Sequence, residues 1–219
     1  MAVDFRLYLI TDRKIATKPL PEAVRLALEG GVKAVQLREK DLPVREFLAL
    51  AQEMRAITRE FGAKLIINDR VDVAMTVGAD GVHLGHQSMP VDAARKVVGT
   101  GLLIGVSTHT TEEALAAQAG GADFVTFGPI FETPSKTGLG NPVGAAAIRY
   151  LKNEINIPIF ALGGIKSGNI LPVMSAGADG VAMISAIMAA DDIRKTAAAF
   201  DKALKAISKI VCTDYCSPR

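Results

Sequence analysis

Basic, amide and carboxylate side chains follow short apolar runs at several separate places in the chain. Arg38 and Lys40 come after one run, Asn68 and Asp69 after another, and Ser107 after a third. Guanidinium and ammonium groups bind phosphate oxygens, and hydroxyl and amide groups donate hydrogen bonds to them. A carboxylate among cations suits Mg²⁺, which usually takes one or two protein carboxylates and completes its shell with phosphate oxygens and water. These residues predict a site for two phosphate-bearing groups, one a diphosphate, with Mg²⁺ as cofactor.

The apolar runs that precede these residues recur along the chain and alternate with amphipathic stretches. Most are continuously hydrophobic, which is typical of parallel strands covered on both faces. Strand–helix alternation with this many strands leaves a closed barrel or a large doubly wound sheet. No G-x-G-x-x-G motif follows the first strand, which counts against a dinucleotide-binding sheet. The sequence therefore predicts an α/β fold, a single (β/α)₈ TIM barrel. Its expected strands are Leu7–Ile10, Ala34–Leu37, Leu65–Ile67, Gly81–Leu84, Leu102–Val106, Phe124–Phe127, Ile157–Ala161 and Gly180–Ile184.

Helical periodicity fills the gaps between these runs, most clearly at 21–28, 44–61 and 191–211. Similar glycine-rich segments starting at Gly30, Gly78, Gly121 and Gly177 each precede a strand, so one helix-to-strand turn is expected to be reused. No linker or low-complexity segment indicates a second domain. Residues 1–211 are expected to form the catalytic barrel. Residues 212–219 are expected to be a C-terminal tail in which Cys212 and Cys216 have no special role.

The charge balance argues against polyanionic partners. The formal net charge is +2, from 25 basic and 23 acidic residues, so neither nucleic acid nor an anionic membrane is indicated as a partner. No apolar stretch approaches the roughly 18 residues of a membrane span, and no signal peptide is evident, so a cytoplasmic location is expected. Because aromatics make up only 5% of the chain, the core is expected to consist of aliphatic residues. A homo-oligomer is compatible with the sequence.

A (β/α)₈ barrel places its active site at the C-terminal ends of the strands. Gly163–Gly164 and Ser185 follow the seventh and eighth strands, where this fold commonly binds phosphate through backbone N–H groups. Among the histidines, His109 lies at the expected mouth and is the best acid–base candidate by position. His83, inside a strand, is either a satisfied core residue or a ligand contact. His86, in the following loop, is a weaker functional candidate.

Ordered motifs along nearly the whole chain resemble those of thiamine-phosphate synthases. Any one of them would be weak, but together they run in order from the first strand to the last. The resemblance implies that a hydroxymethylpyrimidine diphosphate and a thiazole phosphate are joined to give thiamine phosphate and diphosphate. It also implies that Mg²⁺ assists departure of the diphosphate. The motifs are Tyr8–Arg13, Gln36–Lys40, Ile67–Arg70, Gly81–Gly85, Gly105–His109, Phe127–Phe131, Leu162–Ile165 and Gly180–Ile187.

The resemblance also implies roles for individual positions. Asp69 and Ser88 fall at the positions of the metal ligands. The pyrimidine diphosphate would be held by Gln36, Leu37, Arg38, Glu39, Lys40, Asn68, Ser107 and Lys136. The thiazole phosphate would be held by Thr133, Pro134, Ser135, Gly164, Ile184 and Ser185. Catalysis would depend on Arg38, Lys40, Ser107, Lys136 and His109.

Two departures from the family pattern leave other functions open. Ser88 stands where the family usually has a second metal-binding Asp, and a neutral hydroxyl is a weaker Mg²⁺ ligand than a carboxylate. The segment Glu132–Asn141 is closer to the thiazole tautomerase relatives, which need no metal and are thought to use a His at the position of His109. The alternatives are therefore a thiazole tautomerase, or a non-catalytic protein that binds thiazole or thiamine phosphate.

Overall fold

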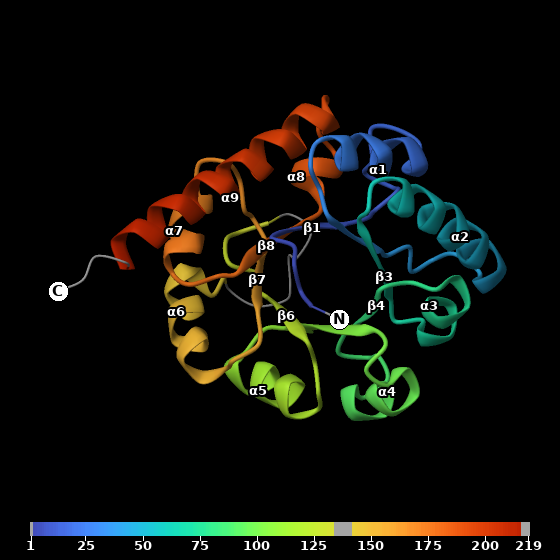
Figure 1. Cartoon of the computed structure of the whole chain (residues 1–219), viewed down its shortest axis with the longest axis horizontal. Helices are drawn as coiled ribbons and strands as arrows, with labels where there is room; N and C mark the ends of the chain where they lie inside the picture. The colour runs from blue at the N-terminus through green and yellow to red at the C-terminus, as the bar shows by residue number, and fades with distance from the viewer. Residues whose placement is uncertain (1, 134–141, 216–219) are drawn as a thin grey trace.

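The strands form one closed parallel barrel. The computed structural model describes residues 2–133 and 142–215. Each strand pairs with its neighbours in chain order, and β8 pairs with β1 to close the sheet. Figure 1 shows the helices arranged around the strands. The predicted (β/α)₈ barrel is therefore confirmed. Its strands are β1 Leu7–Ile10, β2 Ala34–Leu37, β3 Lys64–Asn68, β4 Gly81–Leu84, β5 Leu103–Thr108, β6 Phe124–Phe127, β7 Ile159–Leu162 and β8 Gly180–Met183.

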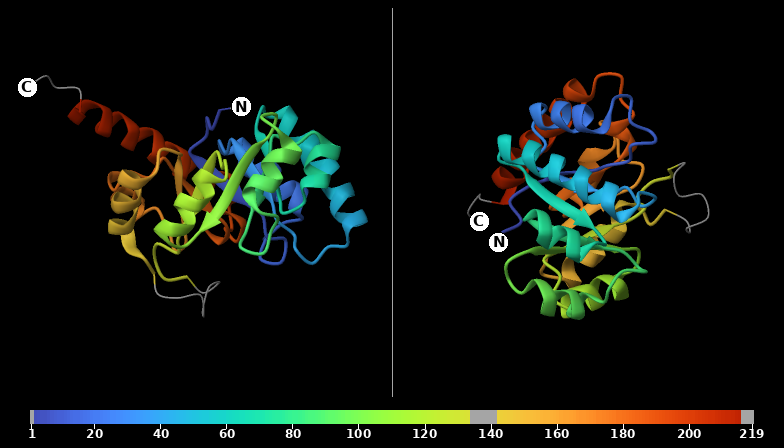
Figure 2. Two further views of the ribbon diagram at one scale, coloured as in Figure 1. Left: turned by 90° about the horizontal axis from the view of Figure 1, so that it is seen from below. Right: turned by 90° about the vertical axis from the view of Figure 1, so that its right-hand side faces the viewer.

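The helices follow the strands in the expected order, and the last one is longer than expected. We predicted a tail from residue 212, but the final helix continues to Tyr215, because no Gly or Pro interrupts it before Pro218. Its C-terminal part extends beyond the barrel (Figure 2). Among the helices of the described ranges, none has the length and apolarity of a membrane span. The helices are α1 Leu20–Glu29, α2 Val44–Glu60, α3 Val71–Val77, α4 Val91–Val98, α5 Thr111–Ala119, α6 Gly144–Glu154, α7 Ile170–Ser175, α8 Ser185–Met188 and α9 Ile193–Tyr215.

Successive side chains of each strand alternate between the barrel interior and the layer beneath the helices. The outer layer is mainly aliphatic, as expected from the composition. The interior departs from that expectation, because four aromatic residues gather there. Phe5, Tyr8, Phe124 and Phe160 pack together, with ring centroids 5.0 Å apart for Phe5–Phe160 and 5.4 Å for Phe124–Phe160. Large rings fill the interior with few residues, so a low aromatic content does not exclude an aromatic core.

The helix-to-strand turns that precede β4, β6 and β8 share an Asp that bonds to the neighbouring strand. Asp80, Asp123 and Asp179 each directly precede an even-numbered strand. Each carboxylate accepts the backbone N–H of the first or second residue of the strand that comes before in the chain, at 2.7–2.8 Å. Each carboxylate also pairs with a basic side chain from a helix. The turn before β2 has Lys33 at the corresponding place and lacks this contact. The Asp therefore ties neighbouring strands and a helix together at the N-terminal end of the barrel.

Replacing Asp80 by Ala should lower the free energy of unfolding by about 2 kcal/mol, because charge-assisted hydrogen bonds to the Leu65 N–H and to Arg55 are both lost. Urea denaturation measures the change. The matched control is Asp92→Ala, whose carboxylate pairs with Lys96 on one helix, with side chains 63% and 79% exposed. That pair should contribute less than about 0.5 kcal/mol. Equal losses in both variants would contradict the structural role of Asp80.

Candidate active site

The alternation along the strands turns predicted binding residues toward one mouth. Arg38, Asn68 and Ser107 each lie an even number of residues after an interior member of the same strand, so their side chains face the interior at the C-terminal rim. All three are half-buried, and Lys40 beyond them is exposed. The structure therefore brings together residues that the chain separates by about 70 positions. The interior members that set this alternation are Ala34, Ile66 and Leu103.

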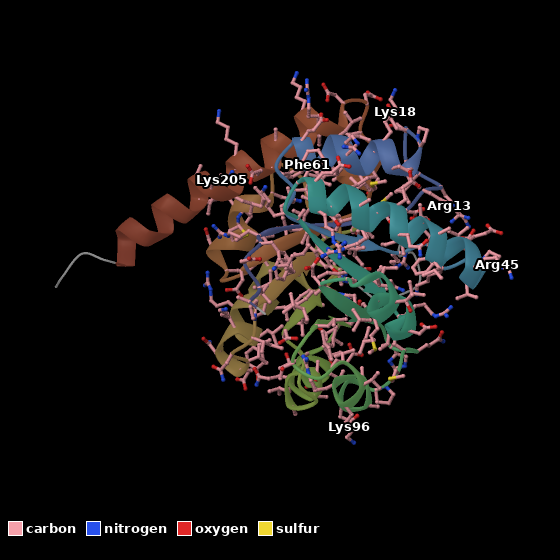
Figure 3. The ribbon with its side chains drawn as sticks, turned by 45° about the vertical axis from the view of Figure 1, so that its right-hand side comes forward. Arg13, Lys18, Arg45, Phe61, Lys96 and Lys205 are labelled. Carbon is pink, nitrogen blue, oxygen red and sulfur yellow. The ribbon has the colours of Figure 1, made fainter. Side chains whose placement is uncertain are left out.

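The same alternation turns the side chains of two predicted site residues away from the mouth. The side chain of Leu37 is fully buried in the cluster beneath the helices, so it does not line the mouth. Glu39 is also buried, and its carboxylate accepts hydrogen bonds from Thr11 Oγ1 at 2.7 Å and from the Arg13 guanidinium at 3.1 Å. Arg13 also pairs with Asp41 (Figure 3 labels Arg13 near the start of α2). Glu39 thus fixes the β1 loop beside the rim, and the role of both positions in substrate binding stays a prediction.

Asp69 occupies a strained turn directly after β3. Its φ is 61°, in the left-handed region that few residues other than Gly adopt, although Asp tolerates it. The backbone is held there by a 2.9 Å hydrogen bond from the Asp69 N–H to the carbonyl of His83. Asn68 Nδ2 donates to Asp69 Oδ2 at 2.7 Å, and the Ser88 hydroxyl donates to Oδ1. Strain held in this way is common at functional sites, so the turn supports a role for the carboxylate.

Ser88 lies beside Asp69, as the predicted pair of metal ligands requires. Its Oγ accepts the Gly85 N–H at 2.6 Å, which fixes the β4 loop against the β3 turn. In the described ranges no three His, Cys, Asp or Glu side chains gather as a metal site. One carboxylate and one hydroxyl are therefore what these residues can offer a cation.

A separate cavity of about 610 Å³ opens at the ends of β7 and β8. The predicted thiazole-phosphate residues Thr133, Gly164, Ile184 and Ser185 line it, and so do Lys166 and Lys195, which the sequence reasoning missed. Both lysines lie outside the family motifs, and only their placement around one cavity distinguishes them from surface lysines. The cavity thus combines backbone N–H groups, a hydroxyl and cations, which suits a phosphate monoester.

The paired glycines after β7 are required by the loop beside them. Gly164 has a φ of 64°, and a Cβ there would lie 2.5 Å from the carbonyl oxygen of Glu132. Gly163 has a φ of 100°, and its Cβ would lie 2.7 Å from Pro129 Cα. Both positions therefore need Gly for backbone conformation and for close packing against the β6 loop.

The histidines differ in environment. Burial lowers the pKa of His83 to about 3, while the nearby Asp69 carboxylate raises it and Arg38 lowers it further. His83 is therefore a neutral interior residue with hydrogen-bond partners on both ring nitrogens, Tyr8 and Ser107. His86 is exposed. His109 lies half-buried at the rim, and its Nδ1 bonds the Gly128 carbonyl, so Nδ1 carries the proton and Nε2 is left as a base.

Some predicted residues lie outside the described residues. These are Pro134, Ser135 and Lys136, and their roles stay predictions. Thr126 is a further residue that the sequence did not indicate. It pairs in register with Ser107, and its buried hydroxyl has no hydrogen-bond partner within the described ranges. An unpaired buried hydroxyl at the base of the mouth could have been found only from coordinates.

Comparisons with known proteins found a matching family and several similar proteins. A family model described as "Thiamine monophosphate synthase" matches residues 7–187. A protein of Geobacter sulfurreducens is 57% identical over 90% of this chain and 93% of its own length. The thiamine-phosphate synthase of Chloroflexus aurantiacus is 48% identical over 90% of each chain. The structure of thiamine phosphate pyrophosphorylase from Pyrococcus furiosus superposes with a TM-score of 0.86 at 40% identity, covering 93% of this chain and 96% of that one.

Proposed function

Because this chain belongs to the thiamine monophosphate synthase family, we propose that it couples a hydroxymethylpyrimidine diphosphate to a thiazole phosphate at the barrel mouth. The products are thiamine phosphate and diphosphate. The observation that supports the proposal is the presence of two separate groups of cationic and hydrogen-bonding residues around one mouth. Arg38, Asn68 and Ser107 form the first on the β2–β5 side, and the cavity at Gly164 and Ser185 forms the second beside β7 and β8.

The reaction needs charge stabilisation and positioning more than a strong base. The bond from the pyrimidine methylene carbon to diphosphate oxygen breaks, and its electron pair leaves with the diphosphate. The thiazole nitrogen lone pair then forms the new C–N bond to that carbon. Arg38 and Lys40 supply positive charge to the departing diphosphate, and Ser107 donates a hydrogen bond to it. The cavity at the ends of β7 and β8 holds the thiazole phosphate so that the thiazole nitrogen faces the methylene carbon.

The residues present fit a magnesium ion that is bound mainly through the diphosphate. Asp69 would be the carboxylate ligand, and Ser88 a neutral one beside it. Mg²⁺ commonly binds with so few protein ligands, because substrate phosphates and water complete its shell. When bound, the ion would neutralise charge on the leaving diphosphate. Asn68 contributes by holding the Asp69 carboxylate through its 2.7 Å hydrogen bond.

The synthase is favoured over a tautomerase or a silent binding protein. The matching family and the Chloroflexus aurantiacus relative carry the synthase name. An isomerase of thiazole phosphate alone would also have no use for the β2–β5 cluster. One assay separates the three: incubate the protein with both phosphorylated precursors, with Mg²⁺ or with a chelator, and measure thiamine phosphate. Metal-dependent product supports the synthase. Isomerisation of the thiazole phosphate by the wild type but not by His109→Ala would indicate the tautomerase. Binding of the phosphates without turnover would indicate the non-catalytic binding protein.

Lys136→Ala should reduce the coupling rate at least tenfold, because a charge-assisted contact to the diphosphate is worth about 1.5–3 kcal/mol. Initial rates at saturating Mg²⁺ measure the effect. Lys33→Ala is the matched control, since Lys33 is exposed just before β2, at the opposite end of the barrel. An unchanged rate in Lys136→Ala would remove this lysine from the site.

A further inference from the structure

A chain of hydrogen bonds crosses the barrel interior beneath the mouth. Gln36 Nε2 donates to the Tyr8 hydroxyl oxygen at 2.9 Å, and that hydroxyl lies 3.3 Å from His83 Nδ1. His83 Nε2 lies 3.0 Å from Ser107 Oγ. The four side chains come from β2, β1, β4 and β5. The chain links Gln36 and Ser107, both implicated in diphosphate binding, through two residues that carry no assigned role.

The direction of the bonds depends on the tautomer of His83, and the first bond favours one of the two. The Tyr8 oxygen accepts from Gln36, and His83 Nδ1 at 3.3 Å is the acceptor that the described residues offer to the single Tyr8 proton. A neutral imidazole that accepts at Nδ1 carries its proton on Nε2. That N–H then donates to Ser107 Oγ. The proton of Ser107 has no acceptor among the four hydrogen-bonded side chains.

The His83 ring is held by its surroundings as well as by its hydrogen bonds. Only 1% of the His83 surface is exposed, and its ring centroid lies 5.9 Å from that of Tyr8 and 5.8 Å from that of Phe124. Gly105 provides the space, because a Cβ there would lie 2.6 Å from His83 Nδ1 and would overlap the Phe124 ring. A ring fixed in this way presents Nε2 to Ser107 in one orientation.

We propose that Tyr8 and His83 are positioning residues that keep the Ser107 hydroxyl as a donor directed at the bound diphosphate. Diphosphate oxygens only accept hydrogen bonds, so Ser107 can bind them only with its own proton. If the hydrogen bonds ran in the opposite direction, the Ser107 hydroxyl would donate its proton to His83. Ser107 would then present only a lone pair to the anion. The proposal rests on the proposed synthase function for its consequence, but the tautomer of His83 is independent of that function.

The first test measures the tautomer in the ligand-free, full-length protein. The chain contains 3 histidines, so a ¹⁵N-histidine-labelled sample gives a simple long-range ¹H–¹⁵N spectrum, and His83→Gln identifies the His83 signals. We expect a protonated Nε2 and an unprotonated Nδ1 near neutral pH, with the Nδ1 shift altered in Tyr8→Phe. A proton on Nδ1, or an averaged mixture of the two tautomers, would overturn the proposal.

The second test measures the consequence for the reaction. His83→Met removes the donor at similar volume and should lower kcat/KM for the pyrimidine diphosphate about tenfold. The KM for the thiazole phosphate should change less than threefold, because the substitution does not alter the cavity at the ends of β7 and β8. His83→Gln, whose amide can still donate to Ser107, should recover most of the loss.

A double-mutant cycle decides whether His83 acts through Ser107. Adding His83→Met to Ser107→Ala should cost little more than Ser107→Ala alone, whereas additive losses would refute the coupling. If the wild-type protein forms no thiamine phosphate, the proposed function fails while the tautomer measurement still stands. If it turns over normally but carries the other tautomer, only the positioning role fails.

Discussion

Asp69→Asn should lower the rate of thiamine phosphate formation about 100-fold or more at saturating Mg²⁺. In the proposed function Asp69 and the neutral Ser88 hold the metal, so the substitution removes the negative charge from the site. A metal ion that neutralises a leaving group contributes several kcal/mol, and each 1.36 kcal/mol is tenfold in rate. Asn also tolerates the left-handed backbone that this position requires, with φ at 61°, so the fold should be retained.

The control for this prediction lies in the same segment. Asp72 lies in the first turn of α3, where it is exposed and pairs with Arg70. Asp72→Asn removes the same charge three residues away and should leave the rate within twofold. Initial rates over a range of Mg²⁺ concentrations and thermal unfolding of both variants complete the comparison. An Asp69→Asn enzyme with normal kcat and normal metal dependence would show that the carboxylate does not hold the ion.

The barrel was predictable because its strands are buried on both faces and therefore read as uninterrupted apolar runs. The rim was predictable for a related reason. In this fold the last residues of each strand and those that follow it lie at the mouth, so Arg38, Asn68 and Ser107 could be placed together without coordinates. The reused turn could be recognised by its glycines, but the bond from Asp80 to the Leu65 N–H depends on strand pairing, which the local sequence does not encode.

The differences between the predicted site and the structure come from properties that depend on the folded structure. Leu37 and Glu39 were included because they lie inside a motif, yet alternation along the strand turns their side chains away from Arg38. Lys166 and Lys195 were missed because a loop lysine and a helix lysine have no distinguishing pattern until both line one cavity. His83 was left between two interpretations, since only the positions of Tyr8 and Ser107 show how a buried imidazole is satisfied.

Acid should destabilise this protein at a pH where its carboxylates are still ionised, because His83 must remain neutral in the folded barrel. Burial lowers its pKa to about 3 from the ordinary value of 6.5, which also describes the unfolded chain. Between these values the unfolded state binds the proton and the folded state does not. Stability from burying a neutral His83 is therefore complete above pH 6.5 and is lost as the pH falls toward 3. The expected slope approaches about 1.4 kcal/mol per pH unit, which amounts to on the order of 5 kcal/mol over the whole interval.

The window from pH 6.5 to 5 isolates this effect, since ordinary carboxylates titrate below it. Urea denaturation of the wild type across the window should show a loss of roughly 2 kcal/mol. His83→Gln cannot take up the proton, so its stability should stay nearly level, whatever its absolute value. His86→Gln, which changes an exposed histidine three residues away, should keep the wild-type slope. A His83→Gln curve parallel to the wild type would mean that the folded barrel accepts a charged His83, and the neutral interior hydrogen-bond chain would have to be abandoned.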